Sequence, residues 1–195
     1  MPDLTHLLLE AGAALPEWAL SKPMIGVWYA LSRLGDHGRL PPFRRLMRLT
    51  DQLWLGGQIN AAGWQRLQKW QIGALVNLRV EWDDRQSGIH TPHYLWLPTV
   101  DGTPPTQEQL QRGVEFIHEQ ISAGRGVYVH CAGGLGRAPT LAICYLVARG
   151  LPADEAIRFV SVRRPFIHLS ARQQAAIHTF AESQQNPALP KAPEP

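Results

Sequence analysis

The chain has 195 residues, of which 45% are hydrophobic and 18% are charged, and this composition is typical of one globular domain with a substantial core. Its formal net charge of +3 mildly favours anionic partners but is too small to indicate nucleic-acid binding, and no zinc-finger or RNA-motif spacing is present. The two cysteines, Cys131 and Cys144, are too few for a disulfide scaffold and favour a reducing compartment.

The N-terminal part of the sequence has no pattern typical of a membrane span or a targeting signal. Its longest apolar run, Met24 to Leu31, is far shorter than the ~20 residues that a span needs. Acidic residues at positions 3, 10 and 17 argue against a secretory signal or a transit peptide. The expected location is therefore the cytoplasm, with a peripheral position at a membrane as the alternative.

Composition divides the chain into three regions. Residues 1–48 carry a helical pattern broken by four prolines, and we expect a helical extension packed on or near the domain. Residues 49–185 alternate short apolar strands with amphipathic helices and are expected to form the domain itself. Residues 186–195 contain four prolines and predict a disordered tail.

The first half of the domain predicts three strands and one helix. Strands are expected at 53–55, 74–78 and 94–97, where short apolar runs end in glycine or polar residues. A helix with Asn60 as its N-cap should follow the first strand.

The second half of the domain predicts further helices around one more strand. Thr106 with Gln109 has the capping-box pattern of a helix start, and a strand at 127–129 follows. Three helices are then expected, at 137–149, at 154–163 and from Ser170 onward. Strands separated by helices predict a single α/β domain whose central, mostly parallel sheet is flanked by helices, with binding sites at the carboxyl ends of the strands.

The stretch VYVHCAGGLGRAPT, residues 127–140, combines features that suit anion binding. A strand leads into His130 and Cys131, three glycines follow within five residues, and then a helix begins near Arg137. Glycines let several backbone N–H groups converge on one anion, and a helix N-terminus adds unpaired N–H groups and partial positive charge. We therefore expect the amides of the segment Ala132, Gly133, Gly134, Leu135, Gly136 and Arg137 to bind phosphate.

Cys131 and Arg137 are the candidate reactive pair in this stretch. If the five residues between them curl into a ring, the guanidinium can bind two phosphate oxygens. Amides and a helix end also stabilise a thiolate, which would then be a nucleophile held against the bound phosphate. Cys144, in contrast, lies mid-helix among apolar residues and is expected to be a core residue.

HCAGGLGR resembles the His-Cys-x5-Arg signature of the cysteine-dependent phosphatases, and the Pro-Thr that follows is similar to the dual-specificity branch. The resemblance runs from about residue 53 to residue 180 and implies a phosphotyrosine-phosphatase-like fold. It implies that Cys131 forms a phosphocysteine, that Arg137 binds the phosphate, and that His130 supports the site. It further implies a phosphoric monoester hydrolase that uses no metal and no cofactor.

The reaction also needs a general acid, and Asp101 is the candidate. The family takes this residue from a loop about thirty positions upstream of the cysteine, and Asp101 lies thirty positions before Cys131, just after a predicted strand. Asp83 and Asp84, which follow another strand end, are the alternatives for the acid. Their expected role is otherwise a solvated loop or a rim that faces the substrate.

Several other residues are interpreted as secondary to the chemistry. Ala138 replaces the Ser or Thr that many relatives carry after the arginine, so we expect slower release of phosphate from the cysteine. The same Gly-Arg-Ala-Pro variant is similar to glucan phosphatases. His90 and His93 lack further ligands at metal-binding spacing and are expected in a loop. Arg163 and Arg164 suit a helix C-terminus and are expected to be structural.

Looser similarities favour a lipid substrate. The segment MIGVWYALSRLGDHGRLPPFRRL, followed by LWLGG, is similar to the region preceding the domain in phosphatases of the mitochondrial phosphatidylglycerophosphate type, and PTVD and FIH resemble later parts of that type. A phospholipid head-group phosphate is therefore the leading substrate, with phosphoprotein and phosphoglucan as alternatives. The basic and aromatic N-terminal segment suits either peripheral contact with an anionic membrane or packing on the domain.

Two other classes of function fit the same residues. A phosphate-binding module without catalysis would use the same loop, although it would need neither the thiol nor the acid. A redox sensor would use an oxidisable Cys131, for which Cys144 is a poor resolving partner because it is expected in the core. Release of inorganic phosphate separates the enzyme from both.

Overall fold

The computed structural model describes residues 46–185. The predicted tail and all but the last three residues of the predicted N-terminal extension lie outside the described residues. Within residues 46–185, no helix is both long enough and apolar enough to cross a bilayer.

Five strands form one sheet in the order β1-β2-β5-β3-β4. The edge strand β1 (Met47–Arg48) is antiparallel to β2 (Leu53–Gly56), whereas β2, β5 (Gly126–His130), β3 (Ile72–Arg79) and β4 (Tyr94–Thr99) are parallel to one another. The prediction of a mostly parallel sheet is confirmed. All four parallel strands end at the same edge of the sheet, where α/β proteins build their binding sites.

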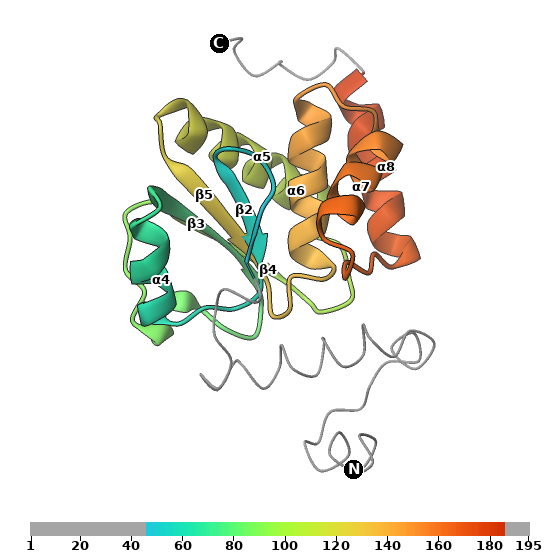
Figure 1. Cartoon of the computed structure of the whole chain (residues 1–195). Helices are drawn as coiled ribbons and strands as arrows, with labels where there is room; N and C mark the ends of the chain where they lie inside the picture. Colours follow the sequence, from blue (N-terminus) through green and yellow to red (C-terminus); the bar gives the residue numbers. More distant parts are fainter. Residues whose placement is uncertain (1–45, 186–195) are drawn as a thin grey trace, which may run out of the picture.

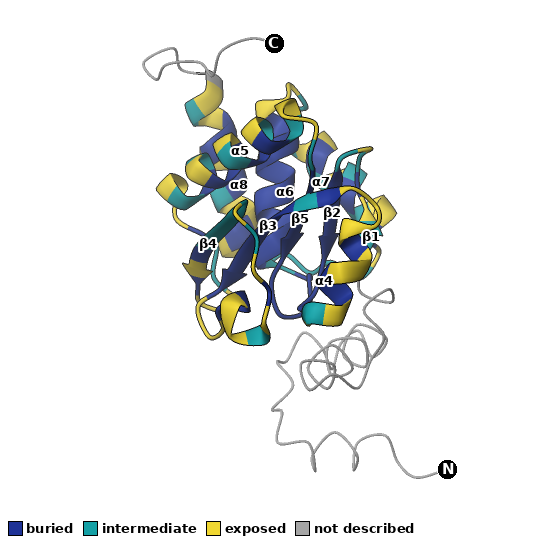
Figure 2. Cartoon of the chain, turned by 90° about the vertical axis from the view of Figure 1, so that its left-hand side faces the viewer, coloured by how far each residue is buried: buried dark blue, intermediate teal, exposed yellow. Residues whose placement is uncertain are grey.

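Helices cover both faces of this sheet, which confirms the predicted fold class (Figure 1). The short helix α4 (Ala61–Gln68) lies on one face. The opposite face carries α5 (Gln107–Ser122), α6 (Arg137–Ala148), α7 (Ala153–Arg163) and α8 (Ala171–Gln185). Figure 2 shows α6 and the strands as the buried centre of the protein, with exposed residues on the outer helices.

The central strand β5 explains how the sequence directs side chains to the two faces. Val127 and Val129 pack into the core beneath α5–α8, whereas Tyr128 packs into the smaller core beneath α4. Because strand residues alternate between faces, His130 lies on the Tyr128 side and stacks on it, with ring centroids 5.5 Å apart. Cys131 belongs to the larger core on the other face.

The predicted helix starts are confirmed by their hydrogen bonds. Asn60 Oδ1 accepts a bond from Gly63 N–H at 2.9 Å at the start of α4. Thr106 forms the complete capping box of α5. The Ser170 N–H donates to Gln173 Oε1 at 3.0 Å before α8. These caps satisfy donors that would otherwise lack partners at helix ends.

Candidate active site

The Cys131 loop, residues 131–136, joins the carboxyl end of β5 to α6 and is almost wholly buried. Its carbonyl groups accept hydrogen bonds from segments outside the loop. Gln58 N–H donates to Ala132 O at 2.9 Å, and His168 N–H donates to Leu135 O at 2.8 Å.

Arg164 holds two further carbonyl groups of the loop. Its Nε donates to Gly134 O at 2.8 Å and its Nη2 donates to Gly133 O at 3.2 Å. Burial lowers the pKa of this guanidinium below its ordinary value. The neighbouring Tyr128 and Cys131 raise the pKa, but by less than burial lowers it. The expectation that Arg164 merely complements the end of α7 was therefore incomplete, because a buried arginine shapes the loop directly.

The outward carbonyls dictate where the N–H groups of the loop point. No peptide bond of the described residues is cis, and in a trans peptide the C=O and N–H point in opposite directions. The amides of residues 133–136 must therefore face away from the donors that hold the carbonyls. Gly134 N–H lies 3.3 Å from Cys131 Sγ, so this inner side is also the side of the sulfur.

Two of the loop glycines have close neighbours, and geometry requires glycine at one of them, Gly134. Gly134 has φ +65°, and a Cβ there would lie 2.4 Å from the C and O atoms of Gly56. A Cβ at Gly136 would lie 2.8 Å from Gln173 Nε2. A larger residue at position 134 would therefore push the loop away from the sheet, whereas one at position 136 would displace the end of the Gln173 side chain.

Both cysteines are buried, but their surroundings differ. Cys131 lies at the carboxyl end of β5 beside the inward N–H groups. Cys144 is fully buried in the middle of α6, as predicted, and burial raises the pKa of its thiol. At neutral pH Cys144 is therefore a protonated core residue.

Arg137 is buried at the start of α6 and binds carboxylates and carbonyls on its outer side. Its Nη1 donates to Glu81 Oε2 at 2.9 Å and to Thr99 O at 2.8 Å. Its Nη2 donates to Glu81 Oε1 at 2.9 Å and lies 3.0 Å from Asp101 Oδ1. Burial lowers the pKa of Arg137, but the hydrogen bonds with Glu81 and the electrostatic interactions with Cys131, Asp101 and Glu81 together outweigh burial, so the pKa is raised.

The Nε atom of Arg137 has no protein partner. A guanidinium has five N–H bonds, and those on Nη1 and Nη2 are directed at the groups named above. Among the buried side-chain polar atoms of residues 46–185, only Arg137 Nε and Trp64 Nε1 lack a hydrogen-bond partner. An unpartnered buried donor on the residue that directly follows the Cys131 loop is suited to binding an anionic oxygen.

Sequence analysis did not single out Glu81, which is the main partner of Arg137. Burial raises the pKa of Glu81, but hydrogen bonds and the charge of Arg137 outweigh burial and hold it at about 2, compared with 4.5 ordinarily. Glu81 lies two residues beyond the end of β3. Its position at a strand end was the only signal in the sequence, and Asp83 and Asp84 share that signal.

Asp101 reaches the site from the turn after β4, as the sequence predicted for its position. Its side chain is 46% exposed and pairs with Arg137 Nη2. The turn is anchored on α8, since Ser170 Oγ donates to Gly102 O at 3.2 Å and Gln173 Nε2 donates to Thr103 O at 3.1 Å. The candidate acid is thus held beside the candidate phosphate-binding group.

The expectation that Asp83 and Asp84 form a solvated loop or a rim was wrong. Both residues are buried, and each carboxylate has polar partners that offset the cost of its burial. Asp83 binds the exposed Arg85 through Oδ2 at 2.6 Å and accepts from Tyr94 Oη at 3.0 Å. Asp84 lies behind the loop, with Oδ2 2.6 Å from His130 Nε2.

Position 138 has no hydroxyl near the sulfur. Ala138 is fully buried in the first turn of α6. The hydroxyl of Thr140, in the same turn, donates to Gly136 O at 2.9 Å and is thereby used within the helix.

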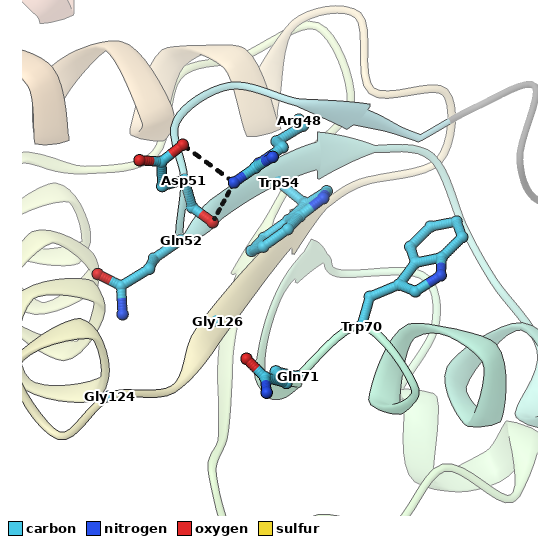
Figure 3. A pocket seen from close by; sticks show the side chains of 8 residues that line it. All are labelled: Arg48, Asp51, Gln52, Trp54, Trp70, Gln71, Gly124 and Gly126. Carbon is cyan, nitrogen blue, oxygen red and sulfur yellow. Dashed lines mark hydrogen bonds and ion pairs between the residues drawn. The ribbon is translucent and has the colours of Figure 1, made fainter.

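A cavity of about 400 Å³ lies at the opposite edge of the sheet. It is lined by Arg48, which ends β1, and by residues that precede or lie near the start of β2, β3 and β5, including Trp54, Trp70 and Gln71 (Figure 3). Arg48 pairs with Asp51 at 2.9 Å beside Trp54. Its lining has no nucleophile or buried acid, so we assign the chemistry to the carboxyl edge and the Cys131 loop.

The arrangement brings together one thiol, inward amides, one arginine with an unpartnered Nε and one partly exposed carboxylate. The amides and Nε can bind phosphate oxygens, and the sulfur lies on the same side of the loop.

His90 and His93 lie in a loop, residues 88–93, that precedes β4.

Comparison with known proteins also indicates a phosphatase. Residues 53–183 match the family described as "Dual specificity phosphatase, catalytic domain". The phosphatidylglycerophosphate phosphatase PTPMT1 of Arabidopsis thaliana is 40% identical over 74 residues, which are 37% of this chain and 22% of that protein. The human phosphatidylglycerophosphatase and protein-tyrosine phosphatase 1 is 33% identical over 115 residues, 58% of this chain and 55% of that protein. The chain thus spans about a fifth and about half of these two relatives.

Solved structures share the fold. The crystal structure of PTPMT1 has a TM-score of 0.65 and 24% identity and covers 72% of this chain and 96% of that chain. PTPMT1 in complex with PI(5)P has a TM-score of 0.66 and 23% identity and covers 74% of this chain and 99% of that chain.

Proposed function

The chain belongs to the family of dual specificity phosphatase catalytic domains, and on that premise we propose that it hydrolyses phosphate monoesters through a phosphocysteine at Cys131. The observation that carries this proposal is the Cys131 loop itself. Gly134 N–H points to the Cys131 sulfur and Arg137 Nε lacks a protein partner, so both the loop amides and this nitrogen are available to phosphoryl oxygens.

The proposed reaction has two steps. In the first, the Cys131 thiolate attacks phosphorus, the S–P bond forms and the P–O bond to the alcohol breaks while Asp101 gives the leaving oxygen a proton. In the second, water attacks phosphorus and gives a proton to Asp101, while the S–P bond breaks and the thiolate returns. Arg137 and the amides hold the phosphoryl oxygens throughout.

Substitution of the nucleophile tests this proposal. Cys131→Ser should lower the hydrolysis of para-nitrophenyl phosphate by roughly a thousandfold or more, and it should still bind tungstate. Cys144→Ala is the control, since Cys144 lies in the core of α6. In the unmodified protein, mass spectrometry after rapid quenching should find phosphate on residue 131. Full turnover by the serine variant would refute the mechanism.

An apolar rim favours a lipid phosphate as the substrate. Arg79 and Thr99 are paired at the ends of β3 and β4, and each is followed by a valine and then by a carboxylate that binds Arg137. Of the five exposed large hydrophobic residues in the described chain, Val80 (47% exposed) and Val100 (60%) lie on these two segments, and Trp82 (40%) directly follows the first.

This apolar rim suits a membrane surface. Tryptophan and aliphatic side chains beside a polar site favour the boundary between head groups and acyl chains. A phosphomonoester presented at that boundary could reach Cys131 while the rim contacts lipid. The curated relatives are named for phosphatidylglycerophosphate, which makes that lipid the leading substrate in our proposal.

A substrate panel tests the lipid proposal. We expect phosphatidylglycerophosphate in anionic vesicles to be hydrolysed with a higher kcat/KM than a phosphotyrosine peptide or phosphoglucan. Trp82→Ala should lower activity toward vesicles more than activity toward para-nitrophenyl phosphate. Trp70→Ala is the matched control, because Trp70 is 52% exposed and lines the cavity at the opposite edge. A preference for the peptide would favour protein substrates instead.

A further inference from the structure

Asp84 is a buried carboxylate with no role in the proposed reaction. It begins the short helix η3 (Asp84–Ser87) and is fully buried behind the Cys131 loop. Its Oδ2 lies 2.6 Å from His130 Nε2, and its Oδ1 accepts from Gln58 Nε2 at 2.6 Å. Burying a carboxylate is costly unless it is paired, so these two contacts are the means by which the fold accommodates it.

The first contact leads to the nucleophile. His130 directly precedes Cys131, and its Nδ1 lies 3.4 Å from Cys131 O. The two ring nitrogens therefore lie beside two oxygen atoms, Asp84 Oδ2 and Cys131 O. The ring is also stacked on Tyr128, whose hydroxyl donates to Gly57 O at 2.6 Å. Asp84 thus fixes the ring that borders the peptide of Cys131.

The second contact leads to Arg137. Gln58 Oε1 accepts from Arg79 Nη1 at 3.1 Å, and Arg79 Nε pairs with Glu81 Oε1 at 3.1 Å. Glu81 in turn binds both Nη atoms of Arg137. Side chains therefore connect Asp84 to Arg137 without a gap.

We propose that Asp84 is a positioning residue, which aligns the Cys131 nucleophile through His130 and the Arg137 guanidinium through Gln58, Arg79 and Glu81. This inference rests on the proposed phosphatase function. One charged group would then set the geometry of both halves of the site. Both chains of contacts that start at Asp84 lead to groups of the proposed reaction, one to Cys131 and the other to Arg137. This shared destination favours a positioning role over a purely structural one.

Replacing the charge while keeping the shape tests this role. Asp84→Asn should lower kcat for para-nitrophenyl phosphate about tenfold or more, with a smaller change in KM. It should also change the pH dependence of the alkylation of Cys131 by iodoacetamide, because His130, which precedes Cys131, loses a charged partner. Cys144 does not interfere, because it is fully buried and its pKa is raised.

The pH dependence of Cys131 alkylation also depends on the charged and titratable groups around Asp84, His130 and Cys131. Cys131 interacts with Arg137 from α6 and with Arg164 from the end of α7. Tyr94 from β4 lies near Asp84, with its hydroxyl 3.3 Å from Asp84 N. The remaining groups are His130, Tyr128, Arg79, Glu81 and Asp101.

Asp83→Asn is the matched control. Asp83 is the neighbouring buried carboxylate, but its contacts are with Arg85 and Tyr94, so it is not bonded to His130 or Arg137. We expect this variant to keep the native kcat and alkylation profile. Equal effects of the Asp83 and Asp84 substitutions on both measurements would overturn the proposal.

Each route can also be tested alone if Asp84→Asn does not fold. Gln58→Met should weaken tungstate binding and leave the alkylation profile unchanged, because it breaks only the route to Arg137. His130→Asn should alter alkylation and affect tungstate binding less. The reverse pattern, or no effect of either variant, would contradict the proposal. Alkylation and tungstate binding need no turnover, so they separate failure of this inference from failure of the phosphatase function.

Discussion

Asp101 Oδ1 lies 3.0 Å from Arg137 Nη2, so the candidate acid rests on the group that should bind the substrate phosphate. To give a proton to the leaving oxygen, Asp101 must exchange this contact for one with the substrate. Substrate binding and positioning of the acid are therefore coupled through one nitrogen.

Asp101→Asn should affect substrates according to their leaving groups. We expect kcat to fall roughly a hundredfold for alkyl phosphates, whose alkoxide needs a proton, and much less for para-nitrophenyl phosphate. Asp51→Asn is the control, because Asp51 is exposed and pairs with Arg48 at the opposite edge. Equal losses for both substrates would remove Asp101 as the acid and direct attention to Glu81.

Glu81→Gln should change how stability depends on pH. The pKa of Glu81 is about 2 in the folded protein, below the ordinary 4.5, so the ionised side chain stabilises the fold above pH 4.5. This contribution is lost as the pH falls toward 2. Urea unfolding should show the variant to be less stable by roughly 1–2 kcal/mol at pH 6, and the difference should vanish near pH 2. A constant difference across this range would contradict the assignment.

Gly134→Ala should be far more damaging than Gly124→Ala. Both glycines have positive φ, at +65° and +77°, but a Cβ at Gly124 would meet nothing within 4 Å. The Gly124 variant should therefore lose only about 1 kcal/mol of unfolding free energy. The Gly134 variant should lose about 3 kcal/mol or more, since its methyl group overlaps the backbone of Gly56. Thermal unfolding of the two proteins measures the comparison.

Arg164→Lys should impair catalysis although Arg164 touches no reacting atom. A lysine has one nitrogen and cannot reproduce the fork that holds Gly133 O and Gly134 O. We expect kcat to fall at least about tenfold and the Tm to decrease. Arg163→Lys is the control at the neighbouring position, where the arginine is exposed and stacks on Phe159.

Ala138→Ser should speed release of phosphate from the cysteine. A hydroxyl at this buried position would lie in the first turn of α6 next to the loop, where it could donate to the departing thiolate. Pre-steady-state kinetics with para-nitrophenyl phosphate should show a smaller burst and a faster steady state. An unchanged second step would mean that the amides and Arg137 already suffice.

The sequence predicted much of the fold because its local signals agree with one another. Asn60, Thr106 and Ser170 begin helices in the structure as their capping patterns indicated. The strand that precedes Cys131 was recognisable from its β-branched residues and from the glycines that follow it.

The sequence did not predict the residues that support the site from a distance. Glu81 and Arg164 act through contacts with residues 56 and 30 positions away, for which no local spacing rule exists. Asp84 was misjudged because an aspartate after a strand is usually solvated. The contact between the Asp84 carboxylate and the His130 ring becomes visible only in the three-dimensional structure.

The outward carbonyls of the Cys131 loop are held by the segment after β2, through Gln58, and by the segment after α7, through Arg164 and His168. The curvature of the ring is therefore a property of how these parts of the chain dock, and the loop sequence by itself does not specify it. A protein in which the end of α7 has detached would keep its hydrophobic core, but its Cys131 loop would no longer be shaped to bind an anion.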